Sequence, residues 1–203
     1  MRLSYPLVAG AALCLGACSI GRPIPTATTY SIELAPATAD ARGPAHPETL
    51  RVGRVRVAAP YDRASLVYRL TAVRYVSDPY HAFLSDPGLV LGNRIAIWLD
   101  QSGLFKEVAG PESVRSAPIV LEATVTELYG DFQQSAQPAA VMTVRFAIVN
   151  QVSARPQIAY ERTITRRIRL ADTSPDELVG GYDTARAEIL SLLATDLSTP
   201  VAH

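Results

Sequence analysis

Hydrophobic and polar residues alternate along most of the chain after residue 29, and this period of two is typical of β-strands with one face in water. The alternation is longest in the segments 119–129, 140–150 and 158–170. Shorter alternating runs occupy residues 30–34, 50–57, 65–76 and 104–108. We expect the three long segments to form the middle of an antiparallel sheet, because each of them has an apolar and a polar face.

The alternation is interrupted at two places. Its phase changes across Gly53 and Arg54, which predicts a bulge or kink between two short strands. Residues 35–48 are rich in proline, alanine and polar side chains, so we expect a loop there, with His46 exposed to solvent. The segment 65–76 has the pattern of a hairpin.

A first helix is predicted from residue 87 onward. Asp86 can cap its N-terminus, Pro87 fits the first turn, and the pattern ends at Gly103. The apolar residues between them recur at spacings of three and four, and they are Leu91, Ile95, Trp98 and Leu99. We expect Trp98 to be a core residue rather than a platform for a ligand.

A second helix has the clearest start signal in the chain. Ser174 as N-cap, Pro175 in the first helical position and Glu177 form a capping box. The apolar stripe that follows consists of Leu178, Tyr182, Ala185, Ile189, Leu193 and Leu197. Gly180 and Gly181 each cost a helix about 1 kcal/mol relative to alanine, and a close approach of the helix to a sheet would explain them.

The order of elements is therefore strands, helix, strands, helix. This order favours an α+β fold, a mostly antiparallel sheet with two main helices packed on one face. A parallel, doubly wound sheet would need more helices. We expect a single domain over residues 30–203, since the length suits one core of ordinary size.

The N-terminus has the features of a bacterial lipoprotein signal. Arg2 precedes an apolar run of about 11 residues that ends in Leu-Gly-Ala-Cys at 15–18, and this run is shorter than the roughly 20 residues that span a membrane. We expect residues 1–17 to be a signal peptide, Cys18 to carry the lipid, and residues 18–29 to form an extended tether. The alternatives are an ordinary secretory signal that ends beside a cysteine, or a buried N-terminal strand.

The cysteines and Ser19 bear on the compartment. Cys14 leaves with the signal and Cys18 is acylated, so the mature chain has no thiol for a disulfide, a metal site or catalysis. Ser19 follows the lipidated residue where an aspartate would favour retention in the inner membrane. We therefore expect an anchor in the outer membrane, facing the periplasm, over an anchor in the inner membrane.

Charge and motifs exclude several classes of function. The chain has 19 basic and 19 acidic residues and loses only Arg2 with the signal, so it lacks the basic excess of nucleic-acid-binding proteins. Its three histidines, His46, His81 and His203, have no metal-ligand spacing, and no phosphate-binding or nucleophile motif is present. The sequence thus predicts neither catalytic residues nor a metal or cofactor site.

Two polar and aromatic clusters, at 78–83 and 129–132, are candidates for a partner-binding edge, because such loops supply interface anchors. The candidate residues are Asp78, Tyr80, Phe83, Tyr129, Asp131 and Phe132. The alternative is turn chemistry, with the aromatic rings folded into the core.

The order and spacing of short motifs between residues 67 and 132 resemble the ABC-type transport auxiliary lipoprotein family, PqiC-type. The motifs are 67–69, Tyr75, 78–80, Phe83, Pro87, 98–99, 102–105, 121–123 and 125–132. A weaker similarity continues through 139–146 to the C-terminal helix.

This resemblance implies an accessory subunit of an envelope lipid-transport system, without enzymatic activity. In such systems an MCE-domain protein and its permease complex move lipids between membranes, and the lipoprotein docks at the outer membrane. A ring of several copies would suit a lipid conduit, so a homo-oligomer is one expectation. We expect conduit assembly rather than carriage of a single lipid, because two helices cover the apolar face of the sheet.

Two other functions stay open at this point. The first is a lipid-anchored scaffold or regulator of cell-wall or lipopolysaccharide assembly, which the neighbouring genes would distinguish from transport. The second is an envelope hydrolase that uses Asp78, His81 or Asp131.

Overall fold

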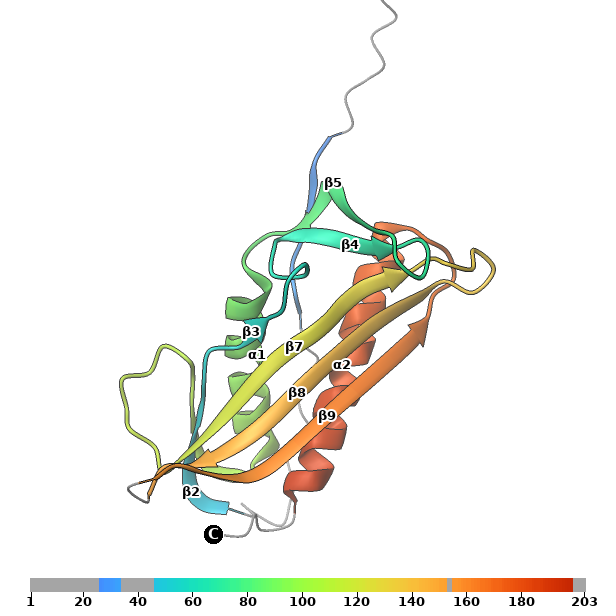
Figure 1. Cartoon of the computed structure of the whole chain (residues 1–203). Helices are drawn as coiled ribbons and strands as arrows, with labels where there is room; N and C mark the ends of the chain where they lie inside the picture. The colour runs from blue at the N-terminus through green and yellow to red at the C-terminus, as the bar shows by residue number, and fades with distance from the viewer. Residues whose placement is uncertain (1–25, 34–45, 153–154, 199–203) are drawn as a thin grey trace, which may run out of the picture.

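The computed structural model describes residues 26–33, 46–152 and 155–198, in which one sheet carries two helices on the same face (Figure 1). The helices are α1 (Pro87–Ser102) and α2 (Pro175–Leu197). The strands are β1 (Thr28–Tyr30), β2 (His46–Val52), β3 (Arg56–Val57), β4 (Ser65–Arg69), β5 (Tyr75–Phe83), β6 (Phe105–Ala109), β7 (Ile119–Asp131), β8 (Ala139–Asn150) and β9 (Gln157–Arg169). This confirms the predicted α+β fold. The predicted signal peptide and Cys18, the predicted lipidation site, lie outside the described residues.

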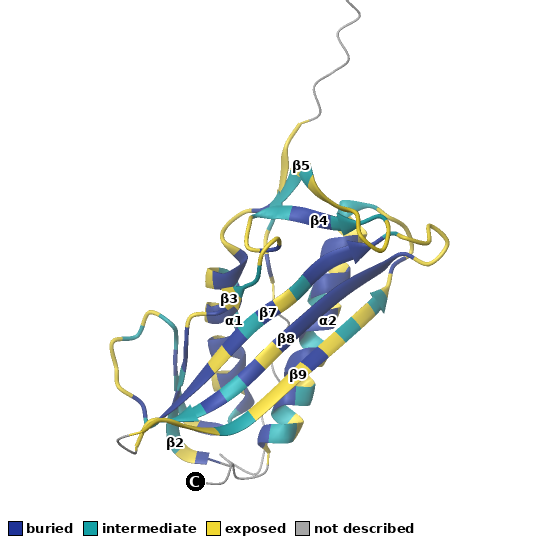
Figure 2. Ribbon diagram, viewed as in Figure 1, coloured by how far each residue is buried: buried dark blue, intermediate teal, exposed yellow. Residues whose placement is uncertain are grey.

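Strands β7, β8 and β9 form a long antiparallel unit, as the alternation predicts. Helix α2 packs against β8 and β9, and α1 packs against β2, β3 and β6. Strand β8 is mostly buried, whereas β9 shows many exposed positions (Figure 2). The prediction that all three strands lie in the middle of the sheet is wrong for β9, which within the described residues pairs only with β8 and forms an edge.

The other edge of β7 is shared by three short strands that all run parallel to it. Leu50 of β2 pairs with Ile119 of β7, Arg56 of β3 pairs with Thr124, and Tyr68 of β4 pairs with Gly130. The predicted break at Gly53 separates β2 from β3. There the Gly53 N–H donates to the Leu121 carbonyl at 2.8 Å, and a Cβ at Gly53 would lie 3.3 Å from the same oxygen.

The predicted hairpin is present, but its second strand is longer than expected. Strand β5 pairs antiparallel with β4 and continues to Phe83, so residues 78–83 lie in a strand and not in a connection to the helix. Pro79 is tolerated there because, among the described residues, β1 pairs with β5 only from His81 onward and the pairing with β4 shifts register beside it. Strand β1 pairs with the end of β5 and includes Thr28 and Thr29, the last two residues of the predicted tether.

Both helices begin at the predicted residues. Asp86 Oδ1 accepts the N–H groups of Gly88 at 2.7 Å and Leu89 at 3.2 Å, and α1 ends at Gly103, whose φ of 68° is left-handed. Trp98 is buried, as expected.

The capping box of α2 is only half formed. Ser174 Oγ accepts the Glu177 N–H, but Glu177 Oε2 accepts the N–H of Ala171 and not that of Ser174. The Ser174 N–H donates instead to Asp172 Oδ1 at 2.7 Å, so the donor that the box would satisfy already has a partner.

The two glycines of α2 differ. A Cβ at Gly181 would lie 2.6 Å from Leu170 Cδ2 and 2.7 Å from Ala140 Cβ, which confirms a close approach of the helix to the sheet. A Cβ at Gly180 would meet no atom within 4 Å, so the close approach does not account for this residue.

His46 is buried, and the prediction of a solvated histidine is wrong. Strand β2 starts at this residue and pairs it with Phe105, whose ring stacks on the imidazole at 4.6 Å between centroids. His46 Nε2 lies 2.7 Å from the Leu197 carbonyl at the end of α2. The loop-like composition around His46 did not predict its burial, because that burial depends on Leu197 in α2, 151 positions later in the chain.

Candidate functional site

The two predicted clusters meet at one end of the sheet, where β4 lies between β5 and β7 (Figure 1). Arg69 of β4 pairs with Tyr75 on one side and with Asp131 on the other. The cluster at 129–132 is divided between the two faces of the sheet, because alternate residues of a strand point in opposite directions. Gly130 faces Leu178 of α2, so Tyr129 and Asp131 face away from the helices.

Tyr68 joins the clusters on the helix-facing side. Its hydroxyl donates to Asp78 Oδ2 at 2.5 Å, and its ring stacks on Phe132 at 5.2 Å between centroids. The sequence assigns Tyr68 only to a strand. To predict its contacts with Asp78 and Phe132, one would need to know that β4 lies between β5 and β7, and the local sequence pattern does not contain this order.

The Asp78 carboxylate is enclosed by donors, and its side chain is only 10% exposed. Oδ1 accepts the backbone N–H groups of Tyr80 at 2.7 Å and His81 at 3.0 Å, and Oδ2 lies 2.8 Å from His81 Nδ1. Burial raises the pKa of Asp78, but the hydrogen bonds from Tyr68, Tyr80 and His81 outweigh it and hold the pKa below its ordinary value. The pairing of β5 with β4 shifts register opposite residues 78–81, which we call the bend of β5. Asp78 therefore fixes this bend as an ionised acceptor.

Tyr129 is the centre of the cluster on the open face of the sheet. Its ring stacks on Tyr61 at 5.9 Å and meets the edge of Tyr75 at 5.5 Å, and the Arg69 guanidinium lies 5.9 Å from its centroid. Burial, followed by the charges of Tyr75 and Tyr129, raises the pKa of Tyr61 to about 12. The three tyrosine rings and the Arg69 guanidinium thus pack as one unit on the open face.

Asp131 lies on the same open face and is also buried. Its Oδ2 accepts from Arg167 Nη1 at 2.6 Å, and its Oδ1 accepts from the Gln133 amide at 3.1 Å. Burial raises the pKa of Asp131, but the hydrogen bonds from Arg167 and Gln133 lower it by a larger amount. The pKa of Asp131 therefore lies below its ordinary value. Asp131 thus holds the start of the β7–β8 loop to strand β9.

Burial divides the six candidate residues. Tyr129 and Asp131 are buried, and so is Phe83, which packs near the Tyr182 ring of α2. Asp78 and Phe132 are half-buried, and Tyr80 is 39% exposed. Of the six candidates, Tyr80 is the most exposed, and most of the predicted edge is therefore packed into the domain.

An exposed apolar group that the sequence did not predict as a binding surface lies next to Tyr80 along the hairpin. Val73 is 90%, Tyr75 38% and Val76 41% exposed. We call these three residues and Tyr80 the hairpin surface. Within the described residues, β1 pairs only with positions 81–83 of β5, so the outer edge of 75–80 has no strand partner.

The part of the chain that the structure describes contains no group of His, Cys, Asp and Glu residues that could hold a metal ion. It brings Asp78 and His81 together, but Asp131 pairs with Arg167 instead. The three residues considered for a hydrolase therefore do not form one site. None of the described helices has the length and apolar character needed to cross a bilayer.

The model of the family described as "ABC-type transport auxiliary lipoprotein component" matches residues 30–194. Protein XCC0632 from Xanthomonas campestris, of family DUF330, has 18% identity and a TM-score of 0.71 over 82% of this chain and 92% of its own. A structure described only as an uncharacterized protein has 20% identity and a TM-score of 0.65 over 84% and 99%. The hypothetical protein CT253 from Chlamydia trachomatis has 11% identity and a TM-score of 0.51 over 75% and 98%. No curated protein sequence matches at a significant level.

Proposed function

Because the chain belongs to the ABC-type transport auxiliary lipoprotein family, we propose that it is a non-enzymatic accessory subunit of an envelope lipid-transport system. In this proposal it docks with an MCE-domain partner, together with the permease complex of that partner, at the outer membrane. It thereby helps to move lipids between membranes and to maintain the envelope.

The hairpin surface is the observation that carries the docking proposal. Exposed aromatic and apolar residues follow one another along β5 and the turn before it, at Val73, Tyr75, Val76 and Tyr80. An unpaired strand edge attracts another strand. Pro79 removes one main-chain donor from this edge, whereas residues 75–78 contain no proline. A partner segment that adds to β5 would form main-chain hydrogen bonds there and cover the exposed side chains.

The two buried clusters support this surface from behind. Asp78 and Tyr68 fix the bend of β5, and Phe132 packs on the Tyr68 ring. Tyr129 packs against Tyr75 from the open face. We propose that Tyr80 and Phe132 contact the partner, and that Asp78, Tyr129 and Asp131 position this end of the sheet, with Phe83 as part of the core.

The proposed anchor would place this surface close to a membrane. Cys18 precedes Thr28 by about ten residues, and a fully extended chain of that length reaches at most roughly 35 Å. Thr28 pairs with His81 of β5, so the tether joins the domain beside the hairpin surface. Replacing Cys18 by Ala should release a folded protein from the membrane fraction, and a variant that stays membrane-bound would contradict lipidation.

Co-purification from detergent-solubilised envelopes tests the docking. The native chain should recover an MCE-domain protein, and the double variant Val76→Asp, Tyr80→Asp should lose it. Val114→Asp is the matched control, because Val114 is fully exposed but lies far along the chain between β6 and β7. Chemical cross-linking of the same material would show whether several copies of the chain also associate.

Two results would contradict the proposal. One is the absence of any MCE-domain protein under conditions that preserve such complexes. The other is recovery of a cell-wall or lipopolysaccharide assembly protein in its place, which would favour the scaffold function.

A further inference from the structure

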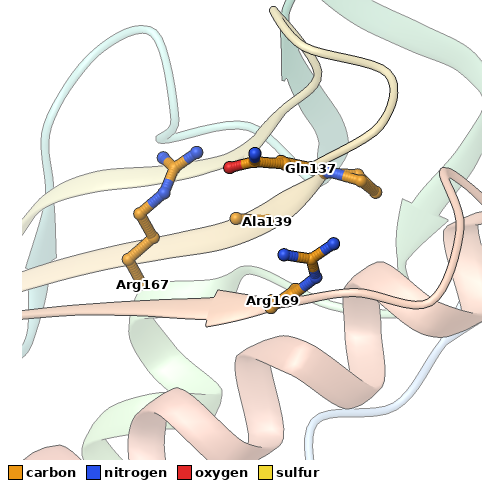
Figure 3. A pocket seen from close by; sticks show the side chains of 5 residues that line it. Gln137, Ala139, Arg167 and Arg169 are labelled. Atoms are coloured by element: carbon orange, nitrogen blue, oxygen red, sulfur yellow. The ribbon is translucent and has the colours of Figure 1, made fainter.

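A small pocket lies on the face of the sheet that carries no helix (Figure 3). Gln137, Pro138, Ala139, Arg167 and Arg169 line it, and its volume is about 210 Å³. Pockets for drug-sized ligands measure roughly 300–1,000 Å³, so this one suits a small group rather than a lipid tail.

Strand register explains why the two arginines meet here. Ala139 in β8 pairs with Arg169 of β9, and Val141 pairs with Arg167. Residues two apart on a strand share a face and lie roughly 6.5–7 Å apart, so both guanidinium groups stand on the same side. Figure 3 shows Ala139 between the two arginine side chains, and its methyl group leaves room that a longer side chain would fill.

The charge of the pocket is positive because one arginine has no acidic partner. Arg167 pairs with Asp131, and on the helix-facing side Arg162 and Arg166 pair with Asp196 and Glu188. Arg169 donates to the Ala136 carbonyl at 3.3 Å and, among the described residues, forms no ion pair.

We propose that this pocket binds a phosphate group, independently of the accessory role proposed above. Two guanidinium groups and the Gln137 amide present donors from different directions, which suits the several oxygens of a tetrahedral anion. A planar carboxylate, with two oxygens in one plane, would use fewer of these donors. The phosphate is either a free ion or the phosphate of a lipid headgroup.

Isothermal titration calorimetry on the purified full-length protein in a nonionic detergent tests the site. The probes are inorganic phosphate and glycerophosphoglycerol, the deacylated headgroup of phosphatidylglycerol, at constant ionic strength. Both should bind saturably at one site. Tighter binding of the diester identifies a lipid headgroup, and equal or tighter binding of inorganic phosphate identifies the free ion.

Arg169→Ala should weaken binding by about tenfold or more, since a hydrogen bond to a charged group contributes about 1.5–3 kcal/mol. Arg169→Lys should restore part of it, because it keeps the charge but loses the planar fork. Arg63→Ala is the matched control, an exposed arginine outside the pocket with no ion pair among the described residues. Absence of saturable binding of either probe, or an equal loss in Arg63→Ala, would overturn the proposal.

Discussion

The hydroxyl of Tyr68 donates to Asp78 across the β4–β5 hairpin, with 2.5 Å between the two oxygens. This bond connects β4, the strand that lies between the two clusters, to the Asp78 carboxylate that fixes the bend of β5. A bond of this kind to a charged acceptor contributes more than one between neutral groups.

Replacing Tyr68 by Phe keeps the stacking on Phe132 and removes the bond. We expect the free energy of unfolding to fall by about 1–2 kcal/mol, because Asp78 keeps its other donors. Urea denaturation of the non-acylated Cys18→Ala chain measures it. Tyr80→Phe, at an exposed position, should change stability by less than about 0.5 kcal/mol. Equal effects of the two variants would contradict the assigned role of Tyr68.

Asp131 predicts a dependence of stability on pH. Its pKa in the folded state lies below the value of about 3.9 expected in an unfolded chain. The ionised form therefore stabilises the fold above the unfolded pKa, and this stability is lost as the pH falls through the folded pKa.

The unfolding free energy of the native chain should thus decrease from about pH 5 downward. Asp131→Asn should show a smaller decrease, and so should Arg167→Gln, which removes the main ion partner of Asp131. Denaturation curves at several pH values check this. An unchanged pH dependence in both variants would show that Asp131 does not contribute.

The two adjacent glycines of α2 form an internal pair of test and control. Alanine at Gly181 would clash with Leu170 and Ala140, so Gly181→Ala should destabilise the fold by about 1–3 kcal/mol. Alanine at Gly180 meets no atom within 4 Å, so Gly180→Ala should stabilise it by about 0.5–1 kcal/mol through helix propensity. Thermal unfolding of both variants measures these effects. A higher melting temperature for Gly181→Ala would rule out the close approach of α2 to the sheet.

His46 contributes through its bond to the Leu197 carbonyl. Replacing His46 by Phe keeps an aromatic ring beside Phe105 but leaves that carbonyl without this donor, so we expect a loss of about 1–3 kcal/mol. His46→Ala should lose more, since it also opens a cavity. Chemical denaturation of both variants tests this, and native stability in His46→Phe would mean that the bond adds nothing.

Local features of this fold could be predicted because their causes are local. The caps at Asp86 and Ser174 act on the first turn of their own helix. The alternation in β7, β8 and β9 reflects the two faces of each strand. These patterns were sufficient for the α+β class and for both helices.

Features that depend on distant partners could not be predicted in this way. A central strand and an edge strand can show the same alternation as β9. The position of β9 in the sheet depends on which strands pair with it, and the alternation does not contain that information. His46 and Tyr68 are buried or bonded by residues on other elements. The sequence therefore named the residues around the candidate site, but not which of them reach the surface.

The shared edge of β7 has a consequence for the order of folding. The segments β2, β3 and β4 find their partners in β7 about 60 to 70 residues later in the chain. Pairing of such distant segments is slow, because closing the long intervening loop costs conformational entropy before any contact forms. Strands β4 and β2 can pair earlier with β5 and β6, so these nearer pairs precede the complete sheet, which assembles only when β7 joins them.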